Sequence, residues 1–153
     1  MIVRRFKISD TSSIAKLFRE TIFTINKGDY SMQQLEVWGN STLSLQEWET
    51  RLESSFTFVA VDGGEIRGFG NLTCTGEIDL LYTHKDYQRK GIAANLLTQL
   101  ETTAKSKGFI GIDTEASITA KPFFESKGYQ VIKKQNKCIK DMFFLNFVMR
   151  KTL

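Results

Sequence analysis

One stretch near the middle of the chain combines residue types that bind phosphate. Gln88, Arg89, Lys90 and Gly91 stand directly before a segment whose apolar residues recur at three- and four-residue steps from Ile92 onward, which predicts a helix. The start of a helix leaves backbone N–H groups unpaired and carries partial positive charge. A ligand can approach Gly91 closely because glycine has no Cβ atom. The pattern therefore predicts an anion site, for phosphate, at residues 88–93.

Two better-known phosphate loops are absent from the sequence. It contains no G-x-x-x-x-G-K-[ST] segment, and no G-x-G-x-x-G follows its first expected strand. The first absence argues against a P-loop nucleotidase, and the second argues against a dinucleotide-binding fold.

The elements that must position this stretch follow from hydrophobic periodicity. Capping residues at 9–11 begin a helix that we expect to stop near residues 26–28, with Gly28 as its C-terminal cap, whereas residues 29–43 show no regular pattern. Gly63 and Gly64 predict a hairpin turn. We expect helices over 11–26, 44–53, 92–107 and 117–127, and strands over 2–6, 56–61, 66–74, 77–83, 109–115, 129–133 and 142–149. The order β-α-α-β-β-β-α-β-α-β-β predicts a single α/β domain over residues 1–153, built on a mixed sheet.

Composition indicates an ordinary globular chain. Its 153 residues are 41% hydrophobic and 25% charged, which is enough to fill one core. No apolar run approaches the roughly 20 residues of a membrane span, and no apolar signal segment follows Met1. Cys74 and Cys138 form no C-x-x-C pair, so neither a metal site nor a redox pair is predicted. We expect a cytoplasmic protein with reduced thiols, no membrane partner, and Cys74 buried on its strand.

The charge of the chain bears on its partners. The formal net charge is +4, and Lys and Arg are scattered apart from the groups at 133–134 and 137–140. A nucleic-acid-binding domain needs a denser basic stripe with interleaved aromatic residues. We therefore expect no nucleic-acid partner, and the positive excess suits a site for a polyanionic cofactor.

Two segments carry a resemblance to a known family. Residues 88–93, Gln-Arg-Lys-Gly-Ile-Ala, resemble the Q/R-x-x-G-x-G/A signature of the GCN5-related N-acetyltransferases. Residues 120–129 are similar to that family's A-x-x-F/L-Y-E-x-x-G-F/Y segment, and the expected element order resembles the family's along the whole chain. The tail at 147–151 resembles small, uncharacterised bacterial members. The resemblance implies acetyl-coenzyme A (acetyl-CoA) as co-substrate, with its pyrophosphate held by the backbone amides of the loop.

The resemblance also implies an activity. The protein would transfer acetyl from acetyl-CoA to a primary amine of a small molecule or peptide, by direct attack in a ternary complex. The alternative is a non-catalytic acyl-CoA-binding sensor or interaction module, because Phe124 replaces the tyrosine that many members place beside the thioester sulfur. The state of assembly stays open, with a homodimer among the options. The implied cofactor-binding residues are Leu81, Tyr82, Thr83, Gln88, Arg89, Lys90, Gly91, Ile92, Ala93, Ser117, Phe123 and Phe124.

The implied catalytic residues are Glu77, Asp79 and Tyr82. Glu77 stands eleven residues before Gln88, which is the offset of the base in histone-acetylating members. Asp79 has the same strand parity, so both carboxylates are expected to face the acceptor cleft. Neighbouring carboxylates raise the pKa of one of the pair, which helps a base to work near neutral pH. In the alternative interpretation Glu77 is a solvated residue at a strand end, and the amine loses its proton through water.

The groups that would polarise the thioester, protonate the leaving thiolate and bind the acceptor are less sharply indicated by the sequence. Backbone N–H groups around Leu81 and Tyr82 would polarise the thioester carbonyl, and Tyr82 or Tyr129 would replace the missing acid. His84 is expected to be a turn residue. The acceptor would lie between the first helices and the last strands, against side chains that otherwise simply fill the core. These side chains are Tyr30, Met32, Trp38, Trp48, Phe143, Phe144 and Phe147.

Overall fold

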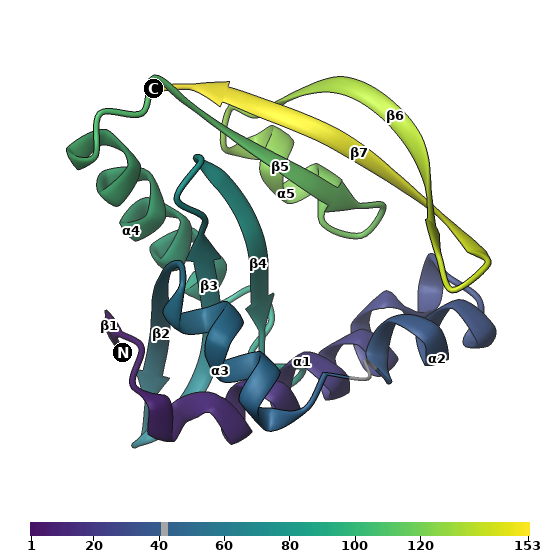
Figure 1. The fold of residues 1–153 in the computed structure, drawn as a ribbon, viewed down its shortest axis with the longest axis horizontal. Coiled ribbons are helices and arrows are strands. Elements are labelled where there is room, and N and C mark those ends of the chain that lie inside the picture. The colour runs from purple at the N-terminus through teal and green to yellow at the C-terminus, as the bar shows by residue number, and fades with distance from the viewer. Residues whose placement is uncertain (41–42) are drawn as a thin grey trace.

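The computed structural model describes residues 1–40 and 43–153. Within these residues, seven strands form one mixed sheet in the order β1-β2-β3-β4-β5-β7-β6, in which only β4 and β5 pair in parallel (Figure 1). The strands are β1 Ile2–Arg5, β2 Phe56–Asp62, β3 Glu65–Leu72, β4 Glu77–Thr83, β5 Gly111–Ser117, β6 Gln130–Ile139 and β7 Met142–Thr152. The mixed α/β fold predicted from the sequence is confirmed.

Helices cover both faces of the sheet. Gly68 lies under the helix that follows the loop, where a Cβ atom would come within 2.7 Å of Ile92, so this helix packs closely on β3. Phe69 points to the opposite face and joins the core of the N-terminal helices. On that face lie α1 Thr11–Ile25, α2 Met32–Gly39 and α3 Leu45–Glu53, and on the other lie α4 Ile92–Ser106 and α5 Lys121–Ser126. Short 3₁₀ helices span Ile8–Asp10 and Asn26–Gly28.

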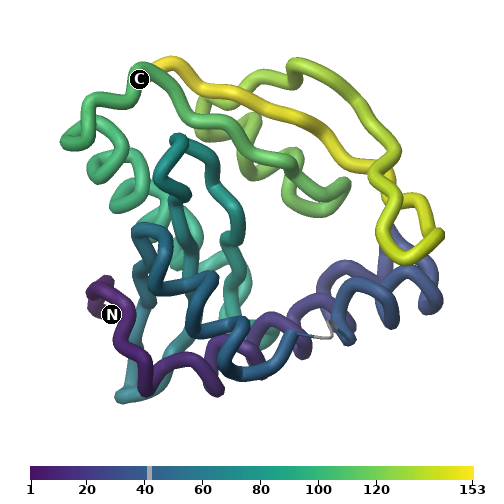
Figure 2. Tube along the Cα trace, viewed as in Figure 1, coloured from purple at the N-terminus to yellow at the C-terminus, as the bar shows by residue number. Residues whose placement is uncertain are grey.

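Strands β4 and β5 are paired over a short distance and then separate. Within the described chain their register joins two residue pairs, Glu77 with Asp113 and Ile78 with Thr114. Beyond this point β4 continues beside β3, whereas β5 continues beside β7, so the sheet opens into two arms (Figures 1 and 2). Backbone groups on the facing edges of the arms lack the ladder partners of a continuous sheet, and a ligand can use them.

A bulge at Asp79 changes the alternation of side chains along β4. Leu72 pairs with Ile78 and Asn71 pairs with Leu80, so the register skips Asp79. The carboxamide of Asn71 fills the gap, because its Oδ1 accepts the Leu80 N–H at 2.9 Å and its Nδ2 donates to Asp79 at 3.3 Å. A bulge re-aims the side chains of its strand. Ile78 consequently packs in the α4 core, whereas Leu80, two residues later, packs on the α1–α3 face.

One helix is missing from the expected order. The sequence pattern predicts no element over 29–43, but Met32–Gly39 form α2, while residues 41–42 lie outside the described part of the chain. Ser31 begins this helix with a capping box to Gln34, a local signal that periodicity does not detect in so short a helix. The observed order is therefore β-α-α-α-β-β-β-α-β-α-β-β.

Several boundaries also differ from expectation. Helix α1 ends at Ile25, and Gly28 closes a following 3₁₀ turn without the positive φ of a glycine cap. Helix α5 begins at Lys121 rather than Ser117, because Ser117 completes β5 and Pro122 favours the first turn of a helix. Strand β6 runs on to Ile139 because it pairs with β7 along a long hairpin.

The cysteines are exposed. Cys74 lies in the turn between β3 and β4, so the prediction of a buried cysteine on a strand is wrong. Cys138 lies on β6. Residues 1–40 and 43–153 contain no helix long and apolar enough to cross a membrane, and no group of three or more His, Cys, Asp or Glu side chains that could hold a metal ion.

Candidate active site

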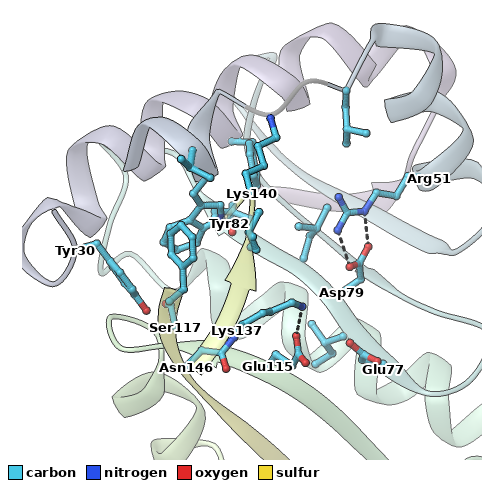
Figure 3. Close-up of a pocket in the computed structure, with 18 residues that line it drawn as sticks. Tyr30, Arg51, Glu77, Asp79, Tyr82, Glu115, Ser117, Lys137, Lys140 and Asn146 are labelled. Carbon is cyan, nitrogen blue, oxygen red and sulfur yellow. Dashed lines mark hydrogen bonds and ion pairs between the residues drawn. The ribbon is translucent and has the colours of Figure 1, made fainter. Parts of the chain in front are cut away.

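A cavity of about 410 Å³ lies where α1, α2 and α3 face the opening between β4 and β5 (Figure 3). Strands β4 and β5 provide carboxylates to its wall, α3 provides a guanidinium group, and the β6–β7 hairpin provides two ammonium groups. These charged residues are Arg51, Glu77, Asp79, Glu115, Lys137 and Lys140. The cavity therefore joins the predicted carboxylates to side chains from the opposite end of the chain.

Glu77 begins β4 and is exposed at the mouth of the opening. Its carboxylate makes no hydrogen bond or ion pair with the described residues. Partial burial raises the pKa of Glu77, and the neighbouring carboxylates, Glu115 first, raise it further, whereas Lys137 lowers it. A carboxylate with free oxygen atoms and a raised pKa suits the acceptance of a proton near neutral pH.

Asp79 is held by Arg51 of α3. Arg51 Nε and Nη2 donate to the two carboxylate oxygens at 2.8 and 2.7 Å, a bidentate pair. Burial alone would raise the pKa of Asp79, but the hydrogen bonds from Arg51 and its positive charge bring the pKa below its usual value. Both carboxylates line the cavity as expected from sequence, but Asp79 is tied to a structural partner and Glu77 is free.

The register of β3 and β4 determines which backbone amides face the opening. The His84 N–H donates to the Arg67 carbonyl at 2.8 Å, and N–H groups along a strand alternate between its two edges. Tyr82, two residues earlier, therefore also directs its N–H toward β3. Leu81 directs its N–H to the other edge, toward the opening. Of the two amides predicted to polarise a carbonyl, the geometry favours that of Leu81.

The Tyr82 side chain lies on the cavity wall. Its ring stacks on Phe69, with centroids 5.7 Å apart, and meets the edge of Phe18 at 4.9 Å. Burial raises the pKa of Tyr82, so its phenol is protonated at neutral pH. Without the bulge, Tyr82 and Glu77 would lie on opposite faces of β4. The bulge brings both into one cavity.

The Gln88 side chain is hydrogen-bonded within the loop that precedes α4. Its Nε2 donates to the carbonyls of Thr83 and His84 at 2.8 and 3.2 Å, so this side chain shapes the loop. Thr83 is nearly buried, and its carbonyl also accepts the Thr21 hydroxyl at 3.0 Å. His84 accepts the Asp86 N–H on Nδ1, as a turn residue does.

The other side of the loop offers unpaired amides. Arg89 and Gly91 have φ of 59° and 80°, and a Cβ atom on Gly91 would meet no atom within 4 Å. This open backbone at the start of α4 fits a pyrophosphate group. The amides that donate to no acceptor in the described chain include those of Gln88, Arg89, Gly91, Ile92 and Ala93.

Comparison with known proteins identifies the family. Residues 26–153 match the family described as an acetyltransferase (GNAT) domain. The chain belongs to this family. The GNAT chain is also 32% identical, over 97% of its length and 93% of the relative's, to the uncharacterized N-acetyltransferase YafP of Escherichia coli (strain K12).

Solved structures of N-acetyltransferases share its fold. A GCN5-related N-acetyltransferase from Rhodopseudomonas palustris superposes with a TM-score of 0.96 at 28% identity, covering 99% of this chain and 95% of that one. The PaiA N-acetyltransferase of Thermoplasma acidophilum, solved with coenzyme A, gives a TM-score of 0.82 at 20% identity, covering 99% and 98%.

In this GNAT chain the other predicted cofactor residues lie around β5 and α5. Ser117 lines the cavity, and its Oγ accepts the Ala120 N–H at 3.0 Å. Phe124 is buried in the α4 core with its centroid 5.4 Å from that of Phe123. Tyr129 donates its hydroxyl to Glu101 on α4 and does not line the cavity. Of the two tyrosines considered as a substitute acid, Tyr82 alone therefore reaches the described cavity.

The acceptor side differs from the prediction. Tyr30, Trp38 and Phe144 line the cavity. Trp48 is buried in the core, Phe147 packs against the α4 core, and Met32 and Phe143 are exposed, so these four do not line it. The polar residues of the wall were not predicted, because no motif or local spacing in the sequence gives a signal for them. They are Arg51, Glu115, Lys137, Lys140 and Asn146.

Proposed function

We propose that this GNAT protein transfers acetyl from acetyl-CoA to a primary amine of a small molecule or peptide, with residues 1–153 acting as one domain. The observation that carries the proposal is the free carboxylate of Glu77, at the point where the cavity meets the opening between β4 and β5. An acetyl donor bound in the opening and an amine bound in the cavity would meet there. Positioning of the two reactants supplies much of the acceleration in such reactions.

The loop at the start of α4 would hold the co-substrate. Acetyl-CoA supplies the acetyl group as an activated thioester, and its pyrophosphate matches the unpaired amides of residues 88–93. Arg89 and Lys90 add positive charge beside them. The Leu81 N–H would donate to the carbonyl oxygen on which negative charge develops during transfer. The complexes with coenzyme A among fold relatives support this assignment.

Glu77, rather than Asp79, would be the general base. Asp79 has both oxygens engaged by Arg51, and taking up a proton would weaken that ion pair. Glu77 has no such partner, and its raised pKa brings it closer to neutral pH. Tyr82 is the hydrogen-bond donor that we assign to the leaving thiolate, because its phenol lines the cavity and its raised pKa keeps it protonated.

Direct transfer is favoured over an acyl-enzyme. Such an intermediate requires an activated nucleophile in the cavity. Cys74 and Cys138 are not among the residues of the cavity wall, and the Ser117 hydroxyl accepts a backbone N–H. The described lining therefore favours attack by the amine itself within a ternary complex.

A non-catalytic acyl-CoA sensor is the second candidate. The buried, apolar Phe124 at the position of the usual tyrosine favours it. Release of free thiol from acetyl-CoA, followed with a thiol-reactive dye over a panel of primary amines, separates the two functions. We expect amine-dependent thiol release. Stabilisation by acetyl-CoA without thiol release from any amine would instead identify a sensor.

The charges around Glu77 predict opposite pH shifts in two variants. The rate kcat/KM falls at low pH as Glu77 becomes protonated, so this limb follows the pKa of Glu77. Glu115→Gln removes a charge that raises this pKa and is expected to move the limb to lower pH. Lys137→Met removes a charge that lowers it and is expected to move the limb to higher pH.

The measurement is the pH profile of kcat/KM with one amine throughout, because the amine's own ionisation is then common to all variants. Glu125→Gln, at an exposed position of α5 outside the cavity wall, is the control and should leave the limb in place. Shifts of the same sign in both variants would contradict the assignment of Glu77 as base.

A further inference from the structure

Two of the charged residues of the cavity wall form no ion pair with a described residue. Arg51 pairs with Asp79 at 2.7 Å, and Lys137 pairs with Glu115. Glu77 and Lys140 are the remaining charged residues of the described wall, and neither forms an ion pair with a described residue. The masked positions, 41 and 42, are Ser and Thr and carry no charge. The cavity therefore presents one unmatched negative charge and one unmatched positive charge.

The two unmatched charges come from different parts of the site. Glu77 lies among the charged side chains of β4 and β5, whereas Lys140 extends from the β6–β7 hairpin beside the helices (Figure 3). Lys140 and Asp141 form the two-residue turn of this hairpin with φ of 48° and 63°. A hydrogen bond attaches the hairpin to the segment before α2, where the Tyr30 hydroxyl donates to the Leu145 carbonyl at 2.8 Å. This contact fixes the position of the hairpin that carries Lys140.

The same wall contains a side-chain carboxamide whose oxygen has no hydrogen-bond partner. Asn146 of β7 lines the cavity, and its Oδ1 is buried without a hydrogen-bond partner. Buried polar groups without partners are rare in folded proteins. A polar ligand in the cavity would supply what Asn146 lacks.

From these three groups we propose that the acceptor is an amine that also carries a carboxylate, such as an amino acid. This proposal rests on the proposed acetyltransferase function. The amine would lie at Glu77, the carboxylate would lie at Lys140, and Asn146 would hydrogen-bond a polar group of the acceptor. A ligand with one charge of each sign complements a cavity with one unmatched charge of each sign.

Other acceptor classes fit the cavity less well. A polyamine brings several positive charges to a cavity in which Lys140 repels them and Glu77 is the one carboxylate without a partner among the described residues. A simple alkylamine or arylamine leaves Lys140 and Asn146 without partners. Specificity arises as much from such unpaired or repelled groups as from favourable contacts.

The test compares amines that differ in the carboxylate. Phenylalanine is compared with phenethylamine, and 6-aminohexanoate with hexylamine, while spermidine represents the polycations. Thiol release gives kcat and KM for each. We expect the carboxylate-bearing member of at least one pair to have kcat/KM about tenfold higher, which corresponds to about 1.4 kcal/mol. The preferred amino acid should also raise the midpoint of thermal unfolding without acetyl-CoA.

Variants then test whether Lys140 causes the preference for the carboxylate-bearing amine. Lys140→Met is expected to abolish the preference and Lys140→Glu to reverse it, mainly through KM for the carboxylate-bearing amine. Lys134→Glu, on exposed β6 and outside the cavity wall, makes the same change in net charge as Lys140→Glu and should leave the preference intact. A preference that persists in Lys140→Glu, or simple amines or spermidine as the best acceptors, would overturn the proposal. Thiol release from no amine would instead count against the acetyltransferase function.

Discussion

Replacing Gly91 by Glu is expected to abolish the stabilisation of the protein by acetyl-CoA. At a concentration of 100 times its Kd, a ligand that binds only the folded state adds about 2.7 kcal/mol, or about 5–10 °C for a chain of this size. The carboxylate would stand among the amides of residues 88–93, where it repels the pyrophosphate and fills open space. We expect affinity to fall at least about 100-fold, measured by thermal unfolding with increasing acetyl-CoA.

Gly108 offers a matched control for this experiment. It has φ of 83°, close to the 80° of Gly91, and a Cβ atom there would also meet no atom within 4 Å. Both substitutions to Glu therefore carry the same backbone cost, about 1–2 kcal/mol. Gly108→Glu should lower the midpoint of the free protein while keeping the full response to acetyl-CoA. If Gly91→Glu kept that response as well, the loop would not be the pyrophosphate site.

Glu77→Gln is expected to lower kcat/KM by about 10²–10⁴-fold, the usual contribution of a general base. Glutamine keeps the shape of the side chain but cannot accept the proton of the attacking amine. The residual activity should lose the part of the low-pH limb that follows Glu77 and should rise with pH as the free amine forms. Steady-state thiol release between pH 6 and about pH 9.5 measures both effects.

The control for Glu77→Gln is the binding of acetyl-CoA. Glu77 lies in β4 outside the loop at the start of α4, so the thermal response to acetyl-CoA should equal that of the unaltered protein. A kcat/KM within about threefold of the original value would show that the amine loses its proton through water, with Glu77 a solvated strand-end residue.

The loop before α4 could be recognised in the sequence because its parts are contiguous. A strand, a basic turn, Gly91 and a helix lie within about 30 residues, and the geometry of a helix start follows from local chain properties. The strands, apart from their ends, and the hairpin at Gly63–Gly64 follow from patterns of the same range. Helix α2 was missed because eight residues contain too few turns to show a period.

The cavity beside β4 and β5 is different, because it depends on contacts between distant segments. Parity along β4 correctly associates Glu77 with Asp79, but the bulge at Asp79 decides that Tyr82 faces the same cavity. That bulge depends on the carboxamide of Asn71 from the neighbouring strand. Which carboxylate is free depends on Arg51, 28 residues before Asp79 in the chain, on a helix that packs across the sheet.

The sequence by itself thus indicated the family and the loop at the start of α4, since the motifs for both consist of residue types at short, fixed spacing. Tertiary structure alone decided which charges of the cavity remain unmatched. Lys137 pairs with Glu115 across β7, which lies between β5 and β6, whereas Lys140, on the hairpin turn, forms no ion pair with a described carboxylate. Pairing of charges depends on distances in space, and separation along the chain does not specify these distances.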